Sequence, residues 1–154
     1  MTHIADLLPE SNIALDVEAT SKKRLFEQIG QLFEDHAQIA RSIVFDSLFA
    51  RERLGSTGLG QGIAIPHGRI KGLPRALGAF VRPLQPIPFD APDGKPVEQV
   101  FVLLVPEQAT EEHLELLSEH AQMFSEKSFR DQVATATDAN GIHRAFSTWV
   151  PTAR

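Results

Sequence analysis

The most constraining feature of this sequence is an uninterrupted apolar run at residues 100–105, Val-Phe-Val-Leu-Leu-Val. Side chains of a β-strand alternate between the two faces of a sheet, so a strand with one wet face alternates apolar and polar residues. A run without polar positions is typical of a strand buried on both faces. We therefore expect residues 97–105 to form a central strand, with helices covering the sheet on both sides.

Weaker patterns elsewhere supply partners for this strand. Strand-like patterns occur at residues 13–17, 63–66 and 76–81. Helical spacing of apolar residues predicts four helices: one capped by Thr20 or Ser21, a second ending at a left-handed Gly55, a third from Thr110 to about Lys127, and a last one from Asp138 through Trp149.

Strands that alternate with helices around a doubly covered sheet indicate an α/β protein. We expect a three-layer α/β/α sandwich with a mixed central sheet of about five strands, flanked by helices on both faces. The 154 residues suit one domain, at residues 1–150, followed by a short tail at 151–154.

Composition excludes several classes of function. The chain has no cysteine, which removes disulfides, thiolate metal sites and thiol nucleophiles, and leaves six histidines as candidate reactive groups. A net charge of −5 disfavours nucleic-acid binding, which depends on clustered Lys and Arg. The sequence starts without a signal-peptide pattern, and its longest apolar run is too short to span a bilayer. We expect a cytoplasmic protein that is not embedded in a membrane.

Glycines cluster at residues 55–62, where converging backbone N–H groups favour an anion. The standard nucleotide motifs do not match, however. Gln61 stands where a P-loop has its lysine, and Gly58, Gly60 and Gly62 are too closely spaced for a dinucleotide fingerprint. ATP and NAD are therefore disfavoured as ligands, and we expect no cofactor.

A histidine follows this loop in the tripeptide Pro66-His67-Gly68. Proline fixes its own φ and keeps the residue before it extended, while glycine adds no bulk beside the imidazole. These residues predict a histidine delivered from the end of a strand, beside a loop of backbone donors. Such an imidazole suits nucleophilic chemistry, although a lone histidine of this kind is more often a structural hydrogen-bonding residue.

A longer pattern surrounds His67: Glu52, six intervening residues, and then Leu59-Gly60-x-x-Ile63-Ala64-Ile65-Pro66-His67-Gly68. It resembles the active-site signature of the mannitol/fructose-type IIA components of the bacterial phosphotransferase system. The free-standing length and the run Arg-Glu-Arg-Leu-Gly-Ser-Thr-Gly at residues 51–58 look most like the nitrogen-regulatory branch of that family.

The resemblance implies a phosphohistidine carrier in which His67 accepts a phosphoryl group, on Nε2, from an HPr-like phosphocarrier protein (NPr). It implies that His113 orients His67 or bonds its phosphoryl group, and that Arg51 stabilises phosphoryl charge. The loop amides offer a phosphoryl-binding element, for which the candidates are Ser56, Thr57, Gly58, Gly60, Gly62 and Gly68. Regulatory targets implied by the nitrogen branch are potassium-transport proteins or sensor kinases.

Two alternatives stay open at this point. One is a sugar-specific IIA component that passes the phosphoryl group to a fructose- or mannitol-type IIB domain. The other is a binding module without phosphotransfer. An ATP-dependent kinase is disfavoured, because the loop lacks its lysine.

His113 and His120 both fall on the apolar side of the predicted third helix. We expect His120 to be a core residue that bonds to backbone. A metal site of His67, His113 and His120 is disfavoured, because the spacing around His67 is not that of zinc ligands.

Overall fold

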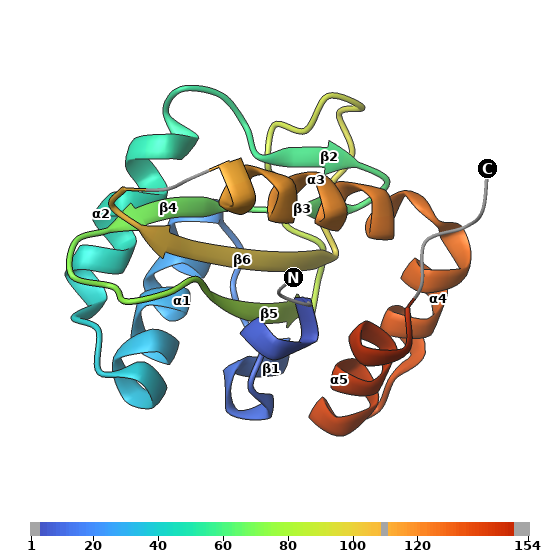
Figure 1. Cartoon of the computed structure of the whole chain (residues 1–154). Coiled ribbons are helices and arrows are strands. Elements are labelled where there is room, and N and C mark those ends of the chain that lie inside the picture. Colours follow the sequence, from blue (N-terminus) through green and yellow to red (C-terminus); the bar gives the residue numbers. More distant parts are fainter. Residues whose placement is uncertain (1–3, 109–110, 150–154) are drawn as a thin grey trace.

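The structure, a computed structural model, describes residues 4–108 and 111–149, with side chains described for residues 6–108 and 115–149 (Figure 1). Within these residues six strands form one mixed sheet in the order β1-β5-β6-β3-β2, with β4 also paired to β6. The strands are β1 (Ile13–Val17), β2 (Gly58–Gly60), β3 (Ile63–Ala64), β4 (His67–Ile70), β5 (Leu77–Pro83) and β6 (Gln99–Pro106).

The apolar run occupies the centre of the sheet, as predicted. Every residue of β6 from Gln99 to Val105 is buried. On one side β6 pairs with β5 in antiparallel register, and on the other side it pairs in parallel with β3 and then with β4. Backbone hydrogen bonds therefore run along both edges of β6, while its side chains are buried alternately on the two faces of the sheet.

Helices cover both faces of the sheet (Figure 1). The helices α1 (Lys22–Ala37) and α2 (Arg41–Glu52) pack on one face, where they meet alternate β6 residues such as Val100 and Val102. The other face carries α3 (Glu111–Ser125), α4 (Lys127–Thr135) and α5 (Ala139–Thr148). This layered arrangement confirms the predicted fold class. Every described helix is too short or too polar to cross a membrane.

Of the two residues predicted to cap the first helix, Ser21 is the one that does so, and Asp138 is confirmed as the cap of the last helix. Thr110, the predicted start of the third helix, lies outside the described residues. The Ser21 hydroxyl accepts a hydrogen bond from the Arg24 N–H at the start of α1, and the Asp138 carboxylate accepts one from the Gly141 N–H at the start of α5. Two short 3₁₀ turns, Ile4–Leu7 and Glu10–Asn12, precede β1.

Two helix ends differ from expectation. The second helix stops at Glu52 instead of Gly55, and the chain continues in tight turns. Gly55 has a φ of 153°, which lies outside the left-handed helical region. The third helix stops at Ser125, because extended backbone at Glu126 separates it from α4, a helix that the apolar spacing did not predict. The Arg130 guanidinium donates to the Phe124 carbonyl at 2.7 Å and so satisfies the end of α3.

The expected strand at residues 63–66 is also shorter than predicted. β3 ends at Ala64, and pairing with β6 resumes at His67 in the same register, with Ala64 opposite Val100 and His67 opposite Leu103. The intervening Pro66 has no N–H to donate to a ladder. His67 therefore begins a strand instead of ending one.

Candidate functional site

A cavity of about 710 Å³ opens where the last turns of α2 meet β4, the end of β6 and α3. Apolar atoms dominate its walls, and the charges in it come mainly from two arginines. Its lining residues are Asp46, Ser47, Ala50, Arg51, Leu54, His67, Gly68, Arg69, Val105 and Leu117. Two of the predicted site residues on distant elements, His67 and Arg51, thus lie in one hollow.

The His67 ring is held in a defined tautomer. Its Nδ1 lies 2.9 Å from the Ile65 carbonyl oxygen. A carbonyl can only accept, so Nδ1 carries the proton and the neutral ring keeps its lone pair on Nε2. The nitrogen that could act as a nucleophile is therefore the one not bonded to the backbone.

The surroundings of His67 favour its neutral form. Partial burial is the main cause that lowers its pKa from the ordinary 6.5, and the positive charge of Arg51 acts in the same direction. The bond to Ile65 and the negative charge of Glu52 oppose this effect. Because the net direction is downward, Nε2 is unprotonated at pH 7 in most molecules.

Gly68 is explained by packing. A Cβ at this position would overlap the Ser47 hydroxyl of α2, and that hydroxyl donates to the Arg69 carbonyl at 2.8 Å. α2 and β4 therefore approach closely beside His67, which is what places Arg51, one turn further along α2, at the same cavity.

Arg51 lies in the last turn of α2, and one guanidinium nitrogen donates to the Gly55 carbonyl at 2.9 Å. A guanidinium has five N–H donors in a planar fork, so this one bond leaves others for an anion. The hydrogen bond restricts where the side chain can point.

The second predicted histidine is placed only by its backbone. Residue His113 belongs to α3, one turn before Leu117, which lines the cavity. Its side chain is outside the described residues. His120, by contrast, is fully buried: its Nδ1 lies 2.7 Å from the Leu116 carbonyl, and its ring centroid is 4.0 Å from that of Phe101. The expectation of a core histidine bonded to backbone is confirmed.

The glycine-rich segment is a β-hairpin turn between β2 and β3, and not an open loop. Gly60 and Gly62 have φ of 89° and 80°, a conformation that favours glycine. Several of the expected amide donors already bond to protein oxygens: the Thr57 N–H to Glu52, the Gly58 N–H to Ser56 Oγ, and the Gln61 N–H to Asp93. Among the predicted loop residues, Gly68 lines the cavity, whereas residues 56–62 do not.

Two residues of this region had no role in the sequence prediction. Glu52 is the first residue of the motif around His67, and its buried carboxylate bonds to Thr57 and Lys22. Leu54, held in a hydrogen-bonded turn, is 83% exposed at the rim of the cavity. The motif spacing was a signal for Glu52, whereas nothing in the sequence distinguished Leu54.

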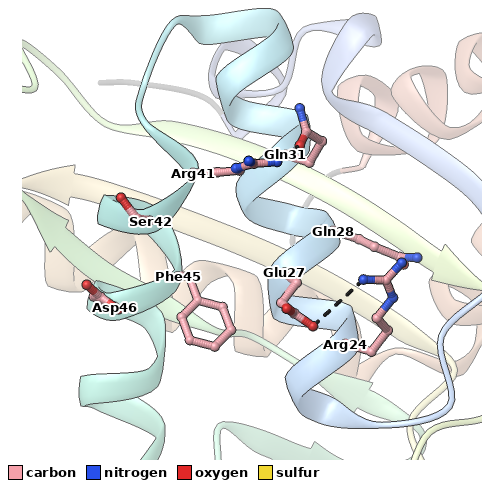
Figure 2. A pocket seen from close by; sticks show the side chains of 8 residues that line it. All are labelled: Arg24, Glu27, Gln28, Gln31, Arg41, Ser42, Phe45 and Asp46. Atoms are coloured by element: carbon pink, nitrogen blue, oxygen red, sulfur yellow. Dashed lines mark hydrogen bonds and ion pairs between the residues drawn. The ribbon is translucent and has the colours of Figure 1, made fainter.

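A second hollow, of about 630 Å³, lies between α1 and α2 and is shown in Figure 2. Its two arginines already have partners: Arg24 lies 3.8 Å from Glu27, and Arg41 donates to Gln31 at 2.8 Å. It offers no nucleophile comparable with His67. Within residues 6–108 and 115–149, whose side chains the structure describes, no group of three or more His, Asp or Glu side chains is arranged to hold a metal ion.

The chain is similar in sequence to known nitrogen regulatory proteins. The chain is 42% identical over 145 residues to the nitrogen regulatory protein of Pseudomonas aeruginosa, covering 94% of each chain, and 37% identical over 147 residues to a nitrogen regulatory protein homolog of Haemophilus influenzae, covering 93% of this chain and 90% of that one.

Among solved structures, the nitrogen regulatory protein IIA-Ntr of Neisseria meningitidis superposes with a TM-score of 0.88 at 55% identity, covering 93% of this chain and 98% of that one. The mannitol IIA of Escherichia coli shares the fold, with a TM-score of 0.75 at 19% identity and coverage of 90% and 97%. Residues 6–149 match the family described as phosphoenolpyruvate-dependent sugar phosphotransferase system, EIIA 2, and the chain therefore belongs to this family of phosphotransfer components.

Proposed function

We propose that this protein is a phosphohistidine carrier of the nitrogen-related phosphotransferase system that accepts a phosphoryl group on Nε2 of His67. The observation that carries the proposal is the hydrogen bond from Nδ1 to the Ile65 carbonyl, which leaves Nε2 with its lone pair in the cavity that Arg51 also lines. The likeness to nitrogen regulatory proteins supports the choice of branch.

The transfer step needs no proton from His67. Nε2 attacks the phosphorus of a phosphohistidine on an HPr-like donor (NPr), the donor's phosphorus–nitrogen bond breaks, and its electron pair returns to the donor imidazole. A new phosphorus–nitrogen bond forms on His67, whose ring becomes cationic because Nδ1 keeps the proton that it donates to Ile65. The donor ring, protonated on its other nitrogen before the transfer, is released as a neutral imidazole. Positioning and charge stabilisation dominate catalysis of such a loose transition state, and Arg51 supplies the charge.

Two further roles complete the proposal. His113, which lies one helical turn before the cavity residue Leu117, orients His67 or bonds its phosphoryl group. The added phosphoryl group carries nearly two negative charges, which changes the surface that partners meet. Potassium-transport proteins or sensor kinases are the regulatory targets that we expect to read this change.

The experiment is incubation of the purified protein with phosphorylated HPr-like donor. We expect an acid-labile, base-stable phosphoprotein, no labelling of His67→Ala, and normal labelling of the control His36→Gln, whose histidine is exposed on α1. Full labelling of His67→Ala would refute the assignment. Purified fructose- and mannitol-type IIB domains added to the labelled protein separate the branches, because a sugar-specific IIA would pass its phosphoryl group to them.

A further inference from the structure

We propose that Glu52 is a positioning residue for phosphoryl transfer, because its buried carboxylate anchors the two chain segments that hold His67 and Arg51. This inference rests on the proposed function for its effect on transfer, but the anchoring itself is a property of the free protein. Glu52 does not line the cavity, so it acts through its neighbours and not on the phosphoryl group.

The Glu52 carboxylate is bonded on both oxygens. Its side chain is 3% exposed, although it stands at the end of α2. Oε2 accepts from Lys22 Nζ at 2.8 Å and from the Thr57 N–H at 3.1 Å, and Oε1 accepts from the Thr57 hydroxyl at 2.7 Å. A buried carboxylate is tolerated only when it is paired and hydrogen-bonded, so these contacts fix Thr57 against the end of α2.

Thr57 links this carboxylate to His67. The Thr57 carbonyl accepts from the Ile65 N–H at 3.0 Å, and the Ile65 carbonyl in turn accepts from His67 Nδ1 at 2.9 Å. A displacement of Thr57 would therefore move Ile65, whose carbonyl selects the tautomer of the ring. The path from Glu52 to the nucleophile consists of hydrogen bonds throughout.

The same carboxylate also controls Arg51. The turn from Glu52 to Thr57 is held at its far end by the bonds from Thr57 to Glu52, and the Gly55 N–H donates to the Glu52 carbonyl at 3.1 Å. Gly55 then accepts from the Arg51 guanidinium at 2.9 Å. Release of Thr57 would loosen the turn and with it the acceptor that orients the arginine.

Lys22 balances the charge of Glu52 from a different helix. It is the first residue of α1, its side chain is 17% exposed, and its Nζ lies 4.6 Å from the centroid of the Phe89 ring. Lys22 supplies the positive charge beside this carboxylate, and the guanidinium of Arg51, bonded to the Gly55 carbonyl, keeps donors for an anion in the cavity. Lys22 is therefore the cation that stabilises the buried carboxylate of Glu52, and Arg51 is the cation that faces the cavity.

The test measures single-turnover transfer from phosphorylated HPr-like donor over a range of donor concentrations. In Glu52→Gln we expect the maximal rate to fall about 10- to 100-fold, as expected for misplaced reacting groups, while the donor concentration that gives half the maximal rate stays unchanged. Thr57→Val, which keeps side-chain size and the Lys22 pair, should change the rate in the same direction. The matched control Val133→Ala weakens the core on the other face of the sheet and should keep both values.

A second readout does not depend on transfer. The ¹⁵N chemical shifts of the His67 ring should report one tautomer in the wild-type protein and a mixture in Glu52→Gln and Thr57→Val. Unchanged rates and unchanged ring shifts in a folded Glu52→Gln, or in Thr57→Val if the first variant fails to fold, would overturn the proposal. If the wild-type protein accepts no phosphoryl group, the proposed function fails, while the ring shifts still decide whether Glu52 anchors His67.

Discussion

Replacement of His120 by phenylalanine should make the stability of this protein less sensitive to acid. The imidazole of His120 is fully buried in α3 against Phe101, with Nδ1 bonded to the Leu116 carbonyl. Its Nε2 is buried and has no hydrogen-bond partner among the described residues. Burial lowers the pKa of this ring to about 4, because a charged imidazole would lose its hydration there.

The sign and size of the effect follow from proton linkage. In the unfolded chain the ring takes up a proton near its ordinary pKa of 6.5, whereas the folded protein resists protonation until about pH 4. Acid therefore favours the unfolded state throughout this interval, and stability falls as the pH falls. At about 1.4 kcal/mol per pH unit, the loss amounts to about 2 kcal/mol at pH 5 and about 3 kcal/mol at pH 4.

The assay is urea unfolding at pH 7.5 and pH 5.0 for the wild-type protein, His120→Phe and the control His36→Gln. Every ionisable group other than the replaced one is common to the compared proteins, so the difference between them isolates His120. We expect His120→Phe to lose about 2 kcal/mol less free energy of unfolding on acidification than the wild type. His36 is exposed, and its replacement should keep the wild-type loss. Equal losses in His120→Phe and the wild type would refute the reasoning.

Two other substitutions test the packing and the rim of the cavity. Gly68→Ala should lower the free energy of unfolding by about 1–3 kcal/mol, measured by urea titration, because the new Cβ overlaps Ser47; a smaller loss in the Ser47→Gly background would support this cause. Leu54→Ser should leave stability almost unchanged but raise the donor concentration for half-maximal transfer roughly 5- to 10-fold, because an 83% exposed leucine beside His67 suits burial by a protein partner. Unchanged donor dependence in Leu54→Ser would exclude this contact.

The central layer could be predicted because the signal was local and strong. A run without polar residues at 100–105 is compatible with few environments, and the structure buries it on both faces. Likewise Ser21 and Asp138 indicate helix starts, because their side chains accept hydrogen bonds from backbone N–H groups only three residues later. Features of this kind need no knowledge of the rest of the fold.

Features that depend on tertiary contacts were missed. The end of α3 at Ser125 is satisfied by Arg130 from the next helix, and no periodicity reveals that bond. The glycines of the β2–β3 turn suggested a phosphate-binding loop. A positive φ is equally suited to a tight turn, and that is the conformation that they adopt here. The role of Glu52 also depends on a tertiary contact, because its partner Lys22 lies thirty positions earlier in the sequence.

The error about the strand before His67 has the largest consequence for the site. A continuous strand through residues 63–67 would commit the backbone groups of Ile65 to the sheet ladder. Instead β3 stops at Ala64 and β4 starts at His67, so Ile65 belongs to neither strand. Its N–H donates to Thr57 and its carbonyl accepts from His67 Nδ1. Between the two strands the Pro66 carbonyl still bonds to β6, where it accepts from the Leu103 N–H at 3.0 Å. The Ile65 carbonyl points away from β6 and is left to accept from Nδ1, which keeps the lone pair of the histidine on Nε2.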